Sequence, residues 1–299
     1  GVQLHAEIMD WVRYMRLTEG ELCARAMAIR NARSVISEVY RSASVQVVGS
    51  LATGLALPDS GIDLLVSGVN PTPQVLGSLA AALLRRGVGM LAVKEADPVF
   101  GTHLAGRLKD TRLPLRLVVC QDPKERSALR PELLNNYLSL FRGAPHLVLL
   151  VKHFLQLRGL KGPEHGGVDS VLTCMMVISF LQQHPSNTVD KGNKRFTGLG
   201  ELLMDFFEVY GQYYSYQCVD MVVVDGGRYD LRGPAGDLLP RLVCNSPVGV
   251  LGHDTWRALR VRDAFEWAAL VLAHQVDPAS EAGTLPPFAT QPTLLARIL

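Results

Sequence analysis

Paired cysteines, long uncharged apolar runs and a strong net charge are all missing from this chain, and each absence excludes a class of protein. The five cysteines are scattered without a C-x-x-C pair, so neither a disulfide scaffold nor a zinc site is expected. Charged residues interrupt every apolar stretch within about 18 residues, which argues against a membrane span. A net charge of +2 is too small to indicate nucleic-acid binding by itself. We therefore expect an intracellular protein of a reducing compartment, with no membrane contact and no evident DNA specificity.

The residues that are present indicate an α/β unit in the first half of the chain. With 299 residues, 48% of them hydrophobic, the chain can bury one large or two medium cores. The first 40 residues have helical spacing, and Thr18 with Glu21 forms a capping-box pattern. From Val45 the pattern changes to short β-branched runs, namely VQVVG, IDLLV, GMLAV and RLPLRLVVC. With one helical segment at residues 72–87, these runs predict a small α/β unit over residues 41–123.

The second half of the chain is predicted to be mostly helical. Apolar residues recur at helical spacing in residues 130–143, 145–159, 169–183, 199–214 and 254–274. Gly226-Gly227 lies between two short runs and predicts one hairpin. Residues 275–292 contain four prolines, and an extended loop is expected there.

One stretch between residues 45 and 65 has most of what a nucleotidyl-transfer site needs. Gly49-Ser50 follows an apolar run, and a second apolar run carries Asp63. Transfer of a nucleotide with two metal ions needs carboxylates on one face of a strand, which means an Asp-x-Asp pair. Here the three residues are Gly61-Ile62-Asp63. One ligand is present, and the neighbouring position has no side chain.

Segments along almost the whole chain resemble one protein family in order and spacing. They are LHAEIMDWVRYM, VQVVGSLATGLALPDSGIDLLV, LVLLVKHFLQLRGL followed by Gly166-Gly167, LGELLMDFFEVYGQYY, RVRDAFEWAALVL and LLARIL. This set resembles the TRAMP-type noncanonical poly(A) polymerases, which are terminal nucleotidyltransferases of the DNA polymerase β-like superfamily. The resemblance implies an α+β fold with a small mixed-sheet nucleotidyltransferase (palm) domain at residues 41–123. It further implies a mostly helical central domain at residues 124–299, with N-terminal helices at residues 1–40 packing on that helical domain.

The same resemblance implies that two of three metal-binding carboxylates are replaced. The family has Ser-Asp-Ile-Asp-Leu where this chain has Ser60-Gly61-Ile62-Asp63-Leu64. The third carboxylate of the family lies on a neighbouring strand, and counting back from Lys152 places Arg116 at that position. Magnesium needs the negative charge of its oxygen ligands, whereas the Arg116 guanidinium would repel it and pair with Asp63. We therefore expect no bound metal and a non-catalytic Asp63. We also expect a contact between Asp63 and Arg116, direct or through water, with their head groups separated by no more than about 4 Å.

Two nearby acids are weak substitutes for the missing ligands. Asp59 follows Pro58 in a segment with turn composition, where a solvated position is expected. Asp122 lies past the end of the last predicted strand and precedes Pro123, so a turn or cap role is expected.

The residues that hold the nucleotide in the family are partly retained. Gly49 and Ser50 match the Gly-Ser that holds the triphosphate. Lys152 matches a phosphate-contacting lysine, although a lysine stem packed in a buried helix would look the same. Ser170-Val171 occupies the place of a base-stacking aromatic residue, and Val171 lacks the aromatic face that contributes about 1–3 kcal/mol per base. The late family motif Asn-x-Val-Gly-Arg is reduced to residues 249–253, GVLGH.

These losses favour a catalytically inactive homologue that is a structural or binding subunit in an RNA-processing or ribonucleoprotein assembly. We expect protein partners and no cofactor. Two alternatives stay open: an active RNA adenylyl- or uridylyltransferase with an atypical metal site, using Mg²⁺ and a nucleoside triphosphate, and a nucleotide sensor without turnover. RNA is an open partner as well, because two basic groups either contact phosphates or are ordinary solvated charges. They are Arg107, Lys109 and Arg112, and Lys191, Lys194 and Arg195.

Overall fold

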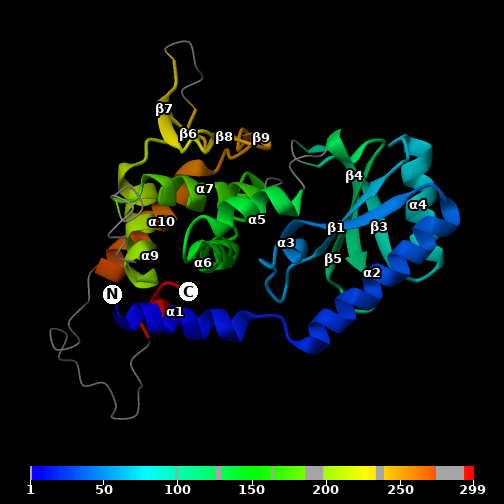
Figure 1. Ribbon diagram of the computed structural model, residues 1–299, viewed down its shortest axis with the longest axis horizontal. Helices are drawn as coiled ribbons and strands as arrows, with labels where there is room; N and C mark the ends of the chain where they lie inside the picture. Colours follow the sequence, from blue (N-terminus) through cyan, green and yellow to red (C-terminus); the bar gives the residue numbers. More distant parts are fainter. Residues whose placement is uncertain are drawn as a thin grey trace. The chain divides into compact units, whose positions relative to one another are not determined.

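The chain folds into two compact units. The computed structural model describes residues 2–97, 100–125, 130–162, 165–185, 198–233, 239–273 and 293–299 (Figure 1). One unit, called the sheet unit, is Met15–Tyr137. The other, called the helical unit, combines Gly1–Tyr14 with Leu138–Leu299.

The sheet unit is built on five strands in the order β1-β2-β5-β4-β3. Its strands are β1 Ser44–Val48, β2 Ile62–Ser67, β3 Gly89–Asp97, β4 Gly101–Leu108 and β5 Pro114–Cys120. Only β2 and β5 are parallel, and the other neighbours are antiparallel, so the sheet is mixed as predicted. The sequence did not predict β4, because GTHLAGRL carries two glycines and few β-branched residues.

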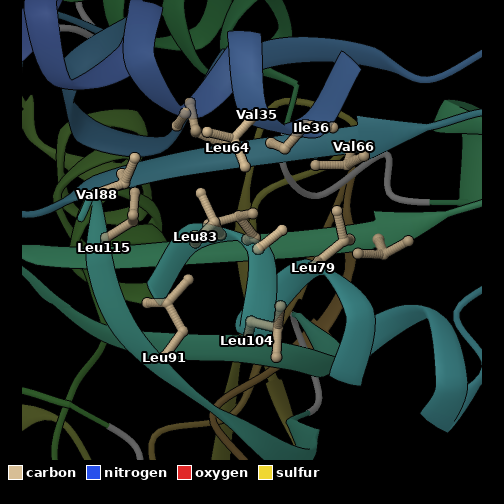
Figure 2. Close-up of a cluster of buried hydrophobic side chains, with 14 of the residues drawn as sticks. Val35, Ile36, Leu64, Val66, Leu79, Leu83, Val88, Leu91, Leu104 and Leu115 are labelled. Atoms are coloured by element: carbon tan, nitrogen blue, oxygen red, sulfur yellow. The ribbon is translucent and has the colours of Figure 1, made fainter. Parts of the chain in front are cut away.

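Two long helices cover one face of this sheet. They are α2 Glu19–Val39 and α4 Pro73–Arg85, and the short α3 Gly49–Ala52 follows β1. The predicted capping box of Thr18 and Glu21 begins α2. Figure 2 shows Val35 and Ile36 of α2 and Leu83 of α4 packed over strand residues that include Leu64 and Leu104. Full burial of such a side chain contributes about 1.5–3 kcal/mol.

The placement of α2 corrects one prediction. Residues 1–40 were expected to pack together on the helical domain, but only α1 Val2–Met15 belongs almost entirely to that unit. Ala32, Val35 and Ile36 of α2 are buried in the core of the sheet unit. The sheet unit also continues to Tyr137 and so includes most of α5 Pro131–Ser139, beyond the boundary expected at residue 123.

The helical unit has an aromatic core. Its other helices are α6 Ala144–Leu157, α7 Ser170–Gln183, α9 Leu199–Glu208, the π-helical turn η3 Val209–Tyr213, α10 Ala258–Ala273 and the 3₁₀ turn η4 Leu295–Arg297. The rings of Phe154 and Phe207 lie 4.8 Å apart, and Phe265 lies 5.7 Å from Phe154. Both chain ends join this unit, since Glu7 of α1 accepts a hydrogen bond of 2.8 Å from the Leu295 backbone N–H.

A second, four-stranded sheet belongs to the helical unit, in the order β7-β6-β8-β9. Its strands are β6 Val219–Val222, β7 Arg228–Leu231, β8 Cys244–Ser246 and β9 Gly249–Leu251. The hairpin predicted at Gly226-Gly227 is confirmed as the antiparallel pair β6 and β7. β8 and β9 were missed because each has only three residues. The loop predicted at 275–292 lies outside the described residues, and no helix among those described is long and apolar enough to cross a membrane.

Candidate functional site

Asp63 and Arg116 face each other across two neighbouring strands. The parallel register of β2 and β5 places the two residues directly opposite each other, so their side chains emerge on the same face of the sheet. Arg116 Nη1 lies 3.6 Å from Asp63 Oδ1. The predicted contact is therefore present. Both side chains are partly exposed, at 32% for Arg116 and 22% for Asp63, and such a pair contributes at most about 1 kcal/mol.

Phe100 holds the other side of the Arg116 guanidinium. Arg116 Cζ lies 3.8 Å from the centroid of the buried Phe100 ring. A cation over an aromatic face at this distance gains about 0.5–2 kcal/mol. Arg116 Nε is buried and has no hydrogen-bond acceptor among the described residues. Phe100 was not singled out from the sequence, because it lies between predicted strands and carries no motif.

Gly49 lies against the Asp63 carboxylate. β1 ends at Val48, which pairs with Asp63, and Gly49 follows with a φ of +68°. A Cβ atom at Gly49 would lie 2.4 Å from Asp63 Oδ2, so only glycine fits here. Ser50 is the next residue, in α3, and its carbonyl accepts the Leu55 N–H at 2.9 Å. The structure thus brings Gly49, Asp63 and Arg116 together, with Ser50 adjacent along the chain.

The space next to Gly61 is filled by a neighbouring strand. A Cβ atom at Gly61 would lie 2.7 Å from Pro114 O and 2.8 Å from Pro114 Cβ. Real Cβ atoms essentially never approach backbone this closely. Of the two other carboxylate positions, one is blocked and the other is a cation paired with Asp63. These residues do not fit the metal pair that the family resemblance implies. Across the described ranges, no group of three or more His, Cys, Asp or Glu residues could hold a metal ion.

The loop that leads to Gly61 is held by Arg25, a residue that belongs to no sequence motif. Arg25 lies on α2 and is only 2% exposed. Its Nη2 donates to Pro58 O at 2.6 Å and to Ser60 O at 3.3 Å. Burial lowers the pKa of the Arg25 guanidinium below its usual range, while Glu21 and Asp59 act in the opposite direction. An arginine inside an amphipathic helix gives no sequence signal for such a role.

The two alternative acids lie where the sequence predicted them. Asp59 is exposed in a turn. Asp122 is exposed as well, and its Oδ1 accepts the Lys124 N–H at 2.8 Å, which makes it a turn residue. Neither position offers a substitute for the carboxylates missing at Gly61 and Arg116.

The other nucleotide-binding candidates belong to the helical unit. Lys152 lies in the middle of α6 and is 2% exposed. Burial raises the pKa of the Cys174 thiol on α7 to about 12, and the nearby Lys152 charge acts against this rise. Ser170 begins α7, and Val171 is half-buried. Asp169 caps this helix, because its Oδ1 accepts the N–H groups of Val171 and Leu172.

Only one of the two basic groups lies within the described residues. Arg107, Lys109 and Arg112 are exposed at the β4–β5 turn, and Arg107 Nη1 donates to Arg112 O at 2.9 Å. Lys191, Lys194 and Arg195 lie outside the described residues.

Comparisons with known proteins identify relatives over most of the chain. Residues 29–126 match the family model of the nucleotidyltransferase domain. The chain is 31% identical over 294 residues to the inactive non-canonical poly(A) RNA polymerase protein Trf4-2 of Drosophila melanogaster, covering 93% of this chain and 70% of that protein. It is 30% identical over 232 residues to poly(A) RNA polymerase protein 1 of Saccharomyces cerevisiae, covering 75% of this chain and 34% of that protein.

Solved structures agree with the fold. The polymerase core of TRAMP, an RNA surveillance complex, superposes with a TM-score of 0.81 at 24% identity, covering 99% of this chain and 93% of that chain. The structure of the GLD-2/RNP-8 complex gives a TM-score of 0.70 at 20% identity, covering 92% of this chain and 95% of that chain. Sequence identity over most of both chains, together with the α+β nucleotidyltransferase fold, shows that this chain belongs to the noncanonical poly(A) RNA polymerase family.

Proposed function

We propose that this chain is a catalytically inactive member of its family that functions as a binding subunit in an RNA-processing assembly. The ion pair between Asp63 and Arg116 is the observation that carries the proposal. A metal-dependent nucleotidyltransferase needs concentrated negative charge at this place. Here the single retained carboxylate is offset by a fixed cation.

The lack of space at position 61 and the name of one relative also support an inactive protein. Pro114 excludes a side chain at position 61, so the missing carboxylate has no room on this backbone. Among the relatives, the Drosophila protein Trf4-2 is itself named an inactive polymerase. Under this proposal, neither Mg²⁺ nor a nucleoside triphosphate is a required cofactor.

The binding role draws on the relatives and on the intact core. One structural relative is the polymerase core of an RNA surveillance complex, and another was solved as the GLD-2/RNP-8 complex. Buried hydrophobic residues form a core in each unit, including one cluster under the sheet of the sheet unit. A fold that keeps its core while its metal site is replaced is suited to holding partners, and we propose protein partners for it.

A primer-extension assay tests the inactivity. The protein is incubated with an RNA primer, labelled ATP or UTP, and Mg²⁺ or Mn²⁺, beside an Asp63→Ala variant. We expect no extension by either protein. Extension by the wild-type chain that disappears in the Asp63→Ala variant would overturn the proposal and favour an active transferase with an atypical metal site.

A further inference from the structure

Trp256 is an exposed tryptophan whose ring is anchored on backbone. It lies in the turn between β9 and α10, and 70% of the residue is exposed. A Cβ atom at Gly166 would lie 2.2 to 2.4 Å from three indole atoms, Cε2, Cδ2 and Nε1. The indole therefore rests against the Gly166 backbone, while most of the residue's surface is exposed to solvent.

The turn that carries Trp256 is rigidly held. Thr255 is buried at 2% exposure, and its Oγ1 donates to Gly252 O at 2.6 Å while accepting the Leu242 N–H at 2.8 Å. Arg257 ties the other side of the turn, since its N–H donates to Gly166 O at 3.0 Å and its Nη1 donates to Gly159 O at 2.9 Å. A ring fixed in this way loses little conformational entropy when a ligand binds.

Basic residues lie close to Trp256 and Gly166 along the chain. His165 precedes Gly166, His253 lies three residues before Trp256, and Arg257 and Arg260 follow it; His165, His253 and Arg260 are exposed. The acidic residues in these two segments are Asp254 and Glu164, which precedes His165. An aromatic face with cations around it is the combination that binds single-stranded nucleic acid, because every base has a π-face and every nucleotide carries a phosphate.

We propose that Trp256 is a stacking platform for a base of single-stranded RNA, with Arg260 placed to contact the neighbouring phosphate. The inference rests on the proposed function and deepens it, since it gives the inactive chain a site for RNA. It requires neither metal nor triphosphate. An exposed tryptophan also serves as an anchor in protein interfaces, but the two arginines that follow this ring in the chain, Arg257 and Arg260, favour a polyanion.

Fluorescence anisotropy with a labelled oligoadenylate of about 12 nucleotides tests the platform, in EDTA and without nucleotide. Trp256→Leu is expected to weaken binding about 10-fold or more, because one stacked base contributes about 1–3 kcal/mol. Trp256→Tyr keeps an aromatic face and should restore most of the affinity. Trp267→Leu is the matched control: Trp267 lies on α10, is 44% exposed and has the Arg158 guanidinium 4.9 Å from its ring. The RNA affinity of the Trp267→Leu variant should stay within about twofold of that of the wild type.

A salt titration separates stacking from charge. Arg260→Gln should lower the slope of log affinity against log salt by about 1, whereas Trp256→Leu should lower affinity and leave the slope unchanged. Equal affinity of the wild type and Trp256→Leu would overturn the platform, and so would a wild type that binds no RNA. Loss of a protein partner in Trp256→Leu without loss of RNA binding would reassign the ring to a protein interface. Primer extension by the wild type would instead overturn the proposed inactivity and leave the platform standing.

Discussion

At Gly61 the chain has lost a carboxylate and has also lost the room for one. Parallel pairing puts Ile62 beside Leu115, so Gly61 falls beside Pro114, whose carbonyl oxygen would lie only 2.7 Å from a Cβ atom at Gly61. The family resemblance predicted the facing of Asp63 and Arg116, because it places Arg116 at the third carboxylate position on a neighbouring strand. It could not predict the close approach of Pro114, which depends on how tightly two strand ends pack.

Substitution of Gly61 should therefore be costly even for the smallest side chain. Gly61→Ala is expected to lower the free energy of unfolding by about 1–3 kcal/mol, because the added methyl overpacks against Pro114. Gly77→Ala is the matched control: Gly77 lies inside α4, and nothing lies within 4 Å of the place that the added methyl would take. Gly77→Ala should raise the free energy of unfolding by up to about 1 kcal/mol. Urea unfolding measures both, and an unchanged stability of Gly61→Ala would contradict the steric argument.

At the scale of elements, the sequence predicted where helices lie better than it predicted which part of the fold each helix packs against. The predicted capping box and the predicted helix of α2 are both confirmed. An amphipathic pattern shows that one face is buried, but it does not show what covers that face. The buried Arg25 is an example, because it donates a hydrogen bond to Pro58, which lies in a loop 33 residues further along the chain. A short-range pattern cannot contain such a contact.

Removal of the Arg25 head group should loosen the link between α2 and the loop before Gly61. In Arg25→Met the carbonyls of Pro58 and Ser60 lose the guanidinium donor, and the free energy of unfolding should fall by about 1–3 kcal/mol. Arg33→Met, on an exposed position of the same helix, should change it by less than about 0.5 kcal/mol. Urea unfolding of the two variants measures the difference. Equal effects would show that the Arg25 hydrogen bonds do not stabilise the loop.

At the scale of the whole molecule, motif order along the chain was enough to predict the fold, because the family segments recur with compatible spacing. Packing inside the helical unit could not be predicted in the same way. Three buried tyrosines there each donate to a backbone carbonyl: Tyr210 to Met176, Tyr214 to Val219 and Tyr216 to Tyr210, at 2.7 to 2.9 Å. A sequence shows the tyrosines, but only the fold shows that their hydroxyls are enclosed.

These tyrosines should make the protein labile in alkali. Burial raises the pKa of Tyr210, Tyr214 and Tyr216 well above the usual value, whereas in the unfolded chain a tyrosine ionises near pH 10. Below about pH 10 both states hold the proton, so this contribution to stability is fully present. Above it only the unfolded state loses protons, and each tyrosine should cost about 1.4 kcal/mol per pH unit until its folded pKa is reached.

Urea unfolding at a series of pH values from about 8 to about 11 checks this dependence. Tyr216→Phe removes one of the three enclosed hydroxyls and should make the alkaline fall less steep by about 1.4 kcal/mol per pH unit. Tyr14→Phe is the control, because Tyr14 is 84% exposed on α1 and its removal should leave the slope as it is. An identical slope in the wild type and Tyr216→Phe would mean that the Tyr216 hydroxyl ionises in the folded protein as readily as in the unfolded chain, contrary to its enclosure.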